Sequence, residues 1–391
     1  DGQVLFVRDP EGRVIGYREL ANEHDDSPRV FAMLDREQRL PRSFWHAAPE
    51  GAPLYTYRSP PALGDGIPVG VLGADDPLRE RLVAMTRGIR DNDYPWTQSV
   101  LVSRDGRLMY EEYFYEYDRD TRHQLRSATK SLVALLAGIA IDRGLFESVD
   151  EPVLPHFDHY DDLLHEDDAK RSITLRHLLS MRSGLACDDW DADSPGNENR
   201  MGESDDWVRF TLDLPMLSAP GTAGSYCSGN VAVVGRMIEL ASGMGLKEFA
   251  DTFLFGPMGI TDYEWDFRPD RSNIDNFAQA WMRPRDMLKV GMLIDQRGEW
   301  GGRQLISAAW IDELASAQGA IQGTPYGYYF WLRHIFDGQR RYEIPQVSGN
   351  GGQKIILLPD QQAIVVMTGG NYNQASNTNR ILVEHLLDGL E

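Results

Sequence analysis

The spacing of apolar residues predicts strands near both ends of the chain and helices between them. Short apolar or alternating runs, which are typical of strands, occur before residue 115 and again after residue 325. They lie at 99–102, 108–110, 326–334, 342–347, 354–358 and 363–368. A sheet built from both ends of the chain, with helices inserted between its strands, is an α+β arrangement.

Apolar residues at helical spacing mark a first helix after Asp76 and a long one from about Ser127 to Arg143. The long helix is expected to end at Gly144, because glycine readily adopts the left-handed conformation that terminates helices. Further helical segments are expected at 175–181, 231–241, 285–295 and 376–390. The region from about 145 to 320 is therefore predicted to be mainly helical.

The first seventy-odd residues are predicted to form a separate segment. Two short strands at 4–7 and 14–17 flank the turn signal Asp9-Pro10-Glu11-Gly12 and predict a hairpin. Turn-forming residues then dominate, so we place a boundary near Gly73 and treat residues 1–73 as an N-terminal appendage. The main unit is 74–391, with a sheet lobe at 74–126 and 321–391 and a helical lobe at about 127–320.

Composition narrows the class of partner. The chain has 391 residues, 42% of them hydrophobic, which is enough for a large core. Its formal net charge of -21 argues against nucleic acid, whose phosphates require a basic surface, and against docking on an anionic membrane. The longest apolar run, Leu132 to Ile141, falls short of the roughly 20 residues that span a bilayer, so we expect no integral membrane segment.

The tetrapeptide Ser127-Ala128-Thr129-Lys130 places a hydroxyl and an amine one helical turn apart. A serine hydroxyl is a weak nucleophile near neutral pH unless a base accepts its proton, and Lys130 can do so only when it is unprotonated. The pKa of Lys130 would have to fall, through burial or through another positive charge nearby. The alternative interpretation is a helix cap followed by a solvated lysine.

Two further segments carry candidate chemistry. Tyr226 lies in a turn-rich run from Pro220 to Asn230 that leads into a helix, and an ammonium beside it would make its phenol easier to ionise. It could instead be a half-buried packing residue. The segment from Ser348 to Gln353 is rich in small residues that would let a substrate carbonyl approach the backbone, or it is simply a hairpin turn.

Serine, lysine and tyrosine elements in this order resemble the serine β-lactamase and penicillin-binding-protein superfamily, in its class C-like and esterase branch. The resemblance covers about residues 76 to 391. Supporting strings are Thr174-Leu175-Arg176-His177-Leu178-Leu179-Ser180-Met181-Arg182-Ser183-Gly184-Leu185, Pro257-Met258-Gly259-Ile260-Thr261, Arg285-Asp286-Met287 and Tyr326-Gly327-Tyr328. The resemblance implies an antiparallel sheet flanked by helices, a mostly helical lobe, and an active site in the groove between them.

The same resemblance implies a role for each motif residue. Ser127 would be the acylated nucleophile, Lys130 its general base, and Tyr226 the proton shuttle to the leaving group. Backbone N–H groups of Ser127 and Asn350 would form the oxyanion hole.

Departures from the family pattern bear on the substrate. Many relatives have Tyr-x-Asn where this chain has Tyr226-Cys227-Ser228, so a hydroxyl replaces the amide that contacts an acylamino side chain. Where relatives have Lys-Thr-Gly, Val347-Ser348-Gly349 offers no cation for a carboxylate. Both departures weaken the β-lactam interpretation.

Several residues are therefore expected to contact substrate. Ser228, Ser348 and Gly349 occupy motif positions, whereas Asp189 and Trp190 either line the groove or belong to a solvated loop. The Tyr-Cys-Ser run followed by Asn230 also resembles nylon-oligomer hydrolases and esterases of the same group.

Cys187 and Cys227 are the only cysteines. In the fold that the resemblance implies, Cys187 lies in a loop near the groove and Cys227 adjoins Tyr226. A disulfide between them is one hypothesis, favoured if the protein is exported; two buried free thiols are the alternative.

We thus expect a serine hydrolase that acts without a metal or another cofactor on small esters, amides or β-lactams. The rivals are a DD-peptidase or weak β-lactamase, and a non-catalytic ligand-sensing module on the same scaffold. The periplasm or the extracellular space is the expected location, with the cytoplasm as the alternative, because the chain opens on Asp1 without a basic, apolar leader. The sequence does not fix the oligomeric state.

Overall fold

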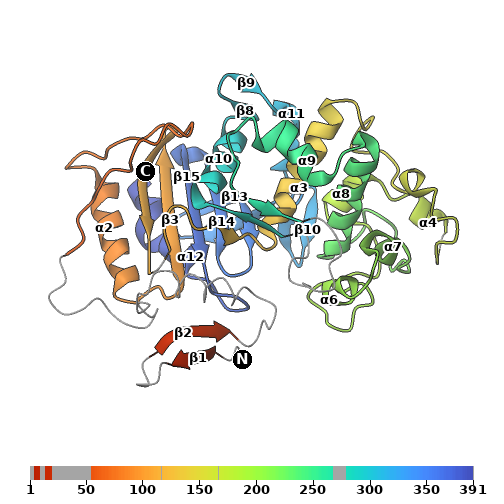
Figure 1. The fold of residues 1–391 in the computed structure, drawn as a ribbon, viewed down its shortest axis with the longest axis horizontal. Helices are drawn as coiled ribbons and strands as arrows, with labels where there is room; N and C mark the ends of the chain where they lie inside the picture. The colour runs from red at the N-terminus through yellow and green to blue at the C-terminus, as the bar shows by residue number, and fades with distance from the viewer. Residues whose placement is uncertain are drawn as a thin grey trace.

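The computed structural model describes residues 4–8, 14–19, 54–115, 117–165, 167–266 and 279–390. Its centre is an antiparallel sheet of eight strands (Figure 1). In spatial order these are β10 (Gly319–Ile321), β11 (Thr324–Tyr326), β12 (Trp331–Phe336), β13 (Arg341–Gly349), β14 (Gln353–Leu358), β15 (Ala363–Gly369), β3 (Thr97–Arg104) and β4 (Arg107–Tyr113). The expected α+β architecture is confirmed.

The two ends of the chain meet at β15 and β3. Val365 lies opposite Val102 and Val366 opposite Leu101 in this pairing, so the sheet cannot form until residues more than 250 positions apart are aligned. β12 pairs with β13 only from Arg341 to Gln346, so in the described strands the last residues of β13 have one edge open. That open edge faces the helical part of the molecule.

Alternation along the strands divides the core between the two faces of the sheet. On one face Ile356 and Val365 pack with Leu82 and Leu386, which belong to α2 (Pro77–Arg90) and to the C-terminal helical segment. That segment consists of α12 (Thr378–Ile381), η5 (Leu382–Leu386) and α13 (Leu387–Leu390). Figure 1 shows α2 and α12 on the same side of the molecule, away from the inserted helices.

The opposite face carries the long helices. α3 (Ala128–Asp142), α8 (Ser228–Ser242) and α10 (Pro284–Asp295) join Val347, Ile355 and Val366 in one continuous core. α3 is buried from Ala128 to Ala140 and ends before Gly144, whose φ is 71°. Gly138 lets the ring of Trp310 lie against α3, because a Cβ there would be 2.1 Å from the Trp310 Cδ1 atom.

The remaining elements are short. The helices are η1 (Leu154–Phe157), α4 (Asp168–Arg171), α5 (Leu175–Leu179), α6 (Glu198–Gly202), α7 (Trp207–Leu212), α9 (Leu246–Ala250), η2 (Asp251–Phe255), α11 (Ala308–Leu314) and η4 (Pro359–Gln361). The strands are β1 (Val4–Arg8), β2 (Val14–Glu19), β5 (His123–Gln124), β6 (Glu264–Trp265), β7 (Ala280–Met282), β8 (Glu299–Trp300) and β9 (Arg303–Gln304). None of the helices in the described ranges combines the length and hydropathy needed to cross a bilayer.

The structure corrects one expected strand. Residues 326–334 do not form a single strand, because β11 ends at Tyr326 and β12 begins at Trp331. A turn separates them, in which the Gly327 N–H donates to the Phe330 carbonyl at 2.8 Å. Glycine is required at this turn, since a Cβ on Gly327 would be 2.2 Å from the Leu314 carbonyl oxygen.

Residues 54–73, which we assigned to the N-terminal appendage, pack on the sheet. Leu72 is buried under α2, and Gly70 and Leu108 are joined by a backbone hydrogen bond of 2.9 Å. Arg285 of α10 bridges Asp65 and Glu111 at 2.7 and 2.8 Å. β1 and β2 pair antiparallel, as the expected hairpin requires, and all other residues up to 53 lie outside the described ranges.

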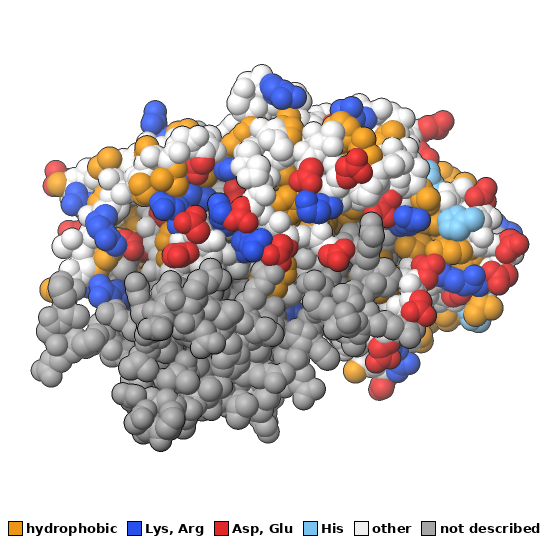
Figure 2. Space-filling view, viewed as in Figure 1, with side chains coloured by type: hydrophobic (Ala, Val, Ile, Leu, Met, Phe, Trp, Pro, Cys, Tyr) orange, Lys and Arg blue, Asp and Glu red, His pale blue; other side chains and the backbone are white. Residues whose placement is uncertain are grey.

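Acidic and basic side chains alternate over the described part of the surface that Figure 2 shows. The excess of acidic residues is therefore spread over this face rather than gathered into one patch.

Cys187 and Cys227 form a disulfide with a Cα–Cα distance of 5.4 Å. It joins the loop after α5 to the residue that precedes α8, across a sequence separation of 40. Closing a loop of that length restricts the unfolded chain and stabilises the fold by roughly 4 kcal/mol in the chain-entropy account.

We therefore expect no titratable thiol in the denatured protein before reduction, and two after it. The Cys187→Ser/Cys227→Ser double variant should lose about 2 to 4 kcal/mol of unfolding free energy, measured by urea denaturation without reductant. Two reactive thiols in unreduced, denatured protein would reject the bridge.

Candidate active site

Ser127 and Lys130 lie at the start of α3, held in place by neighbouring elements. Ser127 occupies the N-cap position, and the Lys130 Nζ atom donates to the Ser127 Oγ atom at 3.2 Å. Arg126, just before it, has a φ of 51°, a strained value for a residue with a side chain. Thr129 and Ser131 anchor the helix start by hydrogen bonds to β7 and to the turn before β12. The half-buried serine and the buried lysine side chain thus meet in a fixed geometry.

Tyr226 completes the group. It is buried immediately before α8, and the Lys130 Nζ atom lies 5.0 Å from its ring centroid. Its phenol interacts by hydrogen bonds with both Ser127 and Lys130. The structure therefore brings Ser127, Lys130 and Tyr226 into mutual contact, although Tyr226 lies about a hundred positions after Ser127 and precedes α8.

The charge state of Lys130 differs from the expectation. Burial acts to lower its pKa, as the sequence argument assumed, but Tyr226, Glu198 and Asp189 together outweigh burial and raise it above its ordinary value. Lys130 is consequently an ammonium in the resting protein at neutral pH. The expectation of a lowered pKa was wrong because it considered the lysine without the two carboxyl groups that the fold places beside it.

Tyr226 departs from expectation for a related reason. The charge of Lys130 and the hydrogen bond with Ser127 do lower the pKa of Tyr226, but burial raises it more, and Asp189 and Glu198 act in the same direction as burial. The net pKa lies above the ordinary value, so the phenol is neutral at rest. Proximity to an ammonium was only one of two opposing effects.

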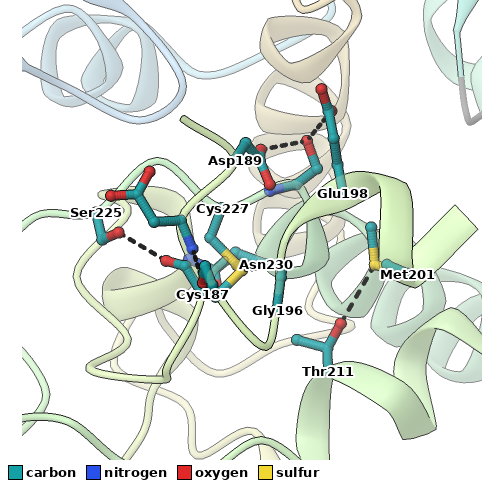
Figure 3. The surroundings of a disulfide bond; sticks show 12 residues. Cys187, Asp189, Gly196, Glu198, Met201, Thr211, Ser225, Cys227 and Asn230 are labelled. Carbon is teal, nitrogen blue, oxygen red and sulfur yellow. Dashed lines mark hydrogen bonds between the residues drawn. A yellow bond between two sulfur atoms is a disulfide. The ribbon is translucent and has the colours of Figure 1, made fainter. Parts of the chain in front are cut away.

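Asp189 and Ser228 lie beside Lys130 and contact each other. The Asp189 Oδ2 atom accepts hydrogen bonds from the Ser228 N–H at 2.8 Å and from the Ser228 hydroxyl at 2.7 Å. Glu198 of α6 approaches the same hydroxyl, with its Oε2 atom at 3.0 Å. Figure 3 shows Asp189 and Glu198 converging from different segments, next to the Cys187–Cys227 bridge. Burial, followed by the negative charge of Glu198, raises the pKa of Asp189 to about 7.

Aromatic rings form one wall beside Tyr226. Trp190 stacks on Tyr226 with a centroid distance of 5.0 Å and an interplanar angle of 6°, and it is 49% exposed. Trp331, at the start of β12, stacks on the same ring at 5.8 Å. Trp190 therefore belongs to the wall of the site rather than to a fully solvated loop.

The end of β13 closes the site on the other side. A Cβ on Gly349 would lie 2.0 Å from the Leu125 carbonyl oxygen and 3.2 Å from the Ala128 nitrogen, so the bare backbone of β13 touches the turn that carries Ser127. Asn350 follows directly, and its side chain is engaged with Asn373, donating to the Asn373 Oδ1 atom at 2.7 Å. The backbone that precedes Asn350 is thereby brought against the turn that carries Ser127.

The structure does not bring the Ser348 side chain into this group. Alternation along β13 puts it on the sheet face shared with Ile344 and Ile356, away from α3. Lys354 of β14, the register partner of Ser348, donates to its hydroxyl. Burial, followed by the charge of Arg333, lowers the pKa of Lys354 to about 8. The motif itself has no cation, as we noted, but the neighbouring strand supplies one to its serine.

Sequence reasoning missed Glu198, Trp331 and Lys354. Glu198 is one of sixty acidic residues, and no spacing relates it to Lys130. Trp331 was hidden inside a segment interpreted as one continuous strand. Lys354 could have been found from register, because a hairpin that closes at Gly351 and Gly352 pairs Ser348 with Lys354.

The histidines between 156 and 165 make local contacts. The His156 Nε2 atom lies 2.9 Å from the Glu151 Oε1 atom, and the His159 ring lies 4.3 Å from that of Tyr160. In the described ranges, three or more His, Cys, Asp or Glu side chains nowhere gather as they would around a metal ion.

The close approach at Gly349 generates a prediction. Gly349→Ala should push β13 away from the Ser127 turn and slow covalent labelling of Ser127 by a fluorophosphonate by roughly 10²-fold, as expected for a misplacement of about 1 Å. The labelling rate is followed by intact-protein mass spectrometry. Gly73→Ala is the control, because no atom lies within 4 Å of the added Cβ. Equal labelling rates in the two variants would show that the approach has no consequence for the site.

Comparison with known proteins gives relatives that include a hydrolase and an esterase. The 6-aminohexanoate-dimer hydrolase of Paenarthrobacter ureafaciens is 24% identical over 85% of this chain and 86% of its own length. An esterase of Burkholderia gladioli, EstB, is 30% identical over 42% of this chain and 45% of its own length.

Solved structures support the fold. A family VIII carboxylesterase superposes with a TM-score of 0.64 at 16% identity, covering 82% of this chain and 99% of the other. The profile of the Beta-lactamase family matches residues 97–387, about three quarters of the sequence. This range contains all eight strands of the central sheet but not residues 54–73, which pack on it. The chain therefore belongs to the Beta-lactamase family, and its relatives agree with the expected hydrolase.

Proposed function

We propose that this protein hydrolyses carboxylic esters or small amides through an acyl-enzyme on Ser127. The single observation that carries the proposal is the contact of 3.2 Å between the Lys130 Nζ and Ser127 Oγ atoms, with Tyr226 against both. A nucleophile, a proton acceptor and a proton donor for the leaving group are the minimum set for acyl transfer.

Acylation needs the Lys130–Tyr226 pair to take one proton from Ser127. The hydroxyl oxygen attacks the substrate carbonyl carbon as its proton passes to the pair, and the carbonyl oxygen becomes an oxyanion near the N–H groups of Ser127 and Asn350. The intermediate then expels the alcohol or amine, which takes the proton back through Tyr226. Water repeats the sequence on the acyl-enzyme and releases the acid.

The substrate class is argued from the site and supported by the relatives. The Ser228 hydroxyl is hydrogen-bonded to Asp189 and Glu198. It therefore cannot contact an acylamino group as a free side-chain amide at this position would. Val347 provides no charge for a carboxylate. The named relatives include an esterase and an amide hydrolase, which favours esters and small linear amides.

The two alternative functions would require different groups at the site. A DD-peptidase or weak β-lactamase would need a carboxylate subsite, for which Lys354, hydrogen-bonded to Ser348, is a candidate cation. A ligand-sensing module would need neither Lys130 nor Tyr226, yet both are present and in contact with Ser127.

We also propose export from the cytoplasm, supported by the Cys187–Cys227 bridge, because disulfides persist in oxidising compartments.

The nucleophile is tested directly. Wild-type protein should hydrolyse short-chain p-nitrophenyl esters and leave nitrocefin intact, and Ser127→Ala should lower kcat/KM by roughly 10³-fold or more. Fluorophosphonate should add one label to the wild type and none to the variant. Ser59→Ala is the control, because it removes a hydroxyl from an exposed position. Labelling that survives Ser127→Ala would move the nucleophile elsewhere.

The raised pKa of Lys130 predicts a pH dependence. Because the ammonium cannot accept a proton, the reactive fraction grows as pH rises toward that pKa, so kcat/KM should increase through the neutral and mildly alkaline range by up to about tenfold per pH unit. Steady-state kinetics on an ester whose uncatalysed hydrolysis is subtracted will measure it. A flat profile, or a maximum in acid, would contradict a lysine–tyrosine base.

A further inference from the structure

The contacts of Ser228 require a proton that the sequence does not reveal. Its hydroxyl has one hydrogen, yet it lies 2.7 Å from the Asp189 Oδ2 atom and 3.0 Å from the Glu198 Oε2 atom. The hydroxyl can donate in only one of these contacts. The other is favourable only if the carboxyl group is protonated and donates to the serine oxygen. The geometry therefore calls for one proton shared by the two acids.

The surroundings of Asp189 favour the same conclusion. Its Oδ2 atom already accepts the Ser228 N–H, whereas its Oδ1 atom is buried and has no hydrogen-bond partner among the described residues. A bare buried oxygen is far less costly on a neutral carboxyl than on a carboxylate.

Backbone contacts and neighbouring residues also hold Asp189 and Glu198 in place. The Asp189 N–H donates to the Tyr226 carbonyl at 2.8 Å, and the Cys187–Cys227 bridge ties the same two segments together. Asn197 is buried, caps α6 through its Oδ1 atom, and donates to the Asp189 carbonyl at 3.1 Å. It therefore fixes the Asp189 loop and the residue next to Glu198 at once. Such a framework identifies a constructed acid pair rather than a chance approach of two surface carboxylates.

We propose that Asp189 and Glu198 are positioning residues that share one proton across Ser228 and thereby set the proton affinity of Lys130. The inference rests on the proposed function, because it assigns these acids a role in the proton transfer from Ser127. With one proton in the pair, its net charge of minus one balances the Lys130 ammonium. Loss of that proton leaves two negative charges facing a single positive one.

The direction of the effect follows from the groups that face the pair. Among the described residues these are Lys130 from α3, Tyr226 before α8, and Ser228 at its first turn. Burial places the titration of Asp189 near neutral pH, at a pKa of about 7. Ionisation of the pair raises the pKa of Lys130 further and so delays the formation of its reactive, neutral form. Removing one of the two acidic charges must therefore lower the pKa of Lys130.

Glu198→Gln is the discriminating variant. A glutamine amide can donate to Ser228 while Asp189 accepts from it, so the contacts are kept and the shared proton is no longer needed. We expect the rising limb of kcat/KM against pH to move to lower pH by about one unit, since one charge facing Lys130 is lost. Glu203→Gln is the matched control, because it makes the same charge change on an exposed residue at the end of the same helix.

The outcomes separate the inference from the function on which it rests. The shared proton is supported if the rising limb of kcat/KM against pH moves in Glu198→Gln and stays in place in Glu203→Gln. A uniform fall in rate at every pH, with the limb unmoved, would assign Glu198 a purely structural role and overturn the inference. If fluorophosphonate labels Ser127 but the Glu198→Gln profile matches wild type, the acyl-enzyme stands and the acid pair fails.

A spectroscopic measurement tests the pair without turnover. Infrared difference spectra of wild type minus Glu198→Gln should show the C=O stretch of one protonated carboxyl group in mildly acidic solution, lost as the pH is raised through neutrality. Absence of that band over the same range would overturn the shared proton even if Ser127 proved not to be the nucleophile. Unchanged thermal unfolding of both variants confirms that they are folded.

Discussion

A buried ammonium group must be compensated by negative charge or it loses its proton, and this constraint organises the site around Lys130. The side chain is 6% exposed, beneath Tyr226 and beside Ser127. Asp189 and Glu198 supply the compensation from a loop and from α6. The disulfide, the cap at Asn197 and the backbone bond from Asp189 to Tyr226 all serve to hold those two acids where the ammonium lies.

The fold was largely predictable because its signals are local. Apolar runs of three to five residues in β3, β14 and β15 are buried on both faces, and the long apolar sequence of α3 reflects a helix buried on every side. The serine and lysine were predictable because both lie on one turn of that helix. Tyr226 and the end of β13 needed the family resemblance, since nothing in their own spacing relates them to Ser127.

What the sequence could not predict depends on contacts between distant segments. The break at Gly327 is imposed by the Leu314 carbonyl, and the burial of Leu72 depends on α2 lying above it. The protonation of Lys130 is the clearest case. Burial alone lowers the pKa of a lysine, so an argument from the helix gave the wrong sign until Tyr226, Glu198 and Asp189, all distant in sequence, were in place.

The same compensation bears on substrate choice, which the fold by itself does not determine. Because the Ser228 hydroxyl is held between two acids, the position where relatives offer an amide to substrate serves the charge balance of Lys130 instead. Polar recognition is thereby reduced at the centre of the groove. The accessible part of the aromatic wall is Trp190, whose ring, like that of the buried Trp331, stacks on Tyr226. A stacked, half-exposed indole contributes contact area without demanding hydrogen bonds, which supports the proposed preference for esters.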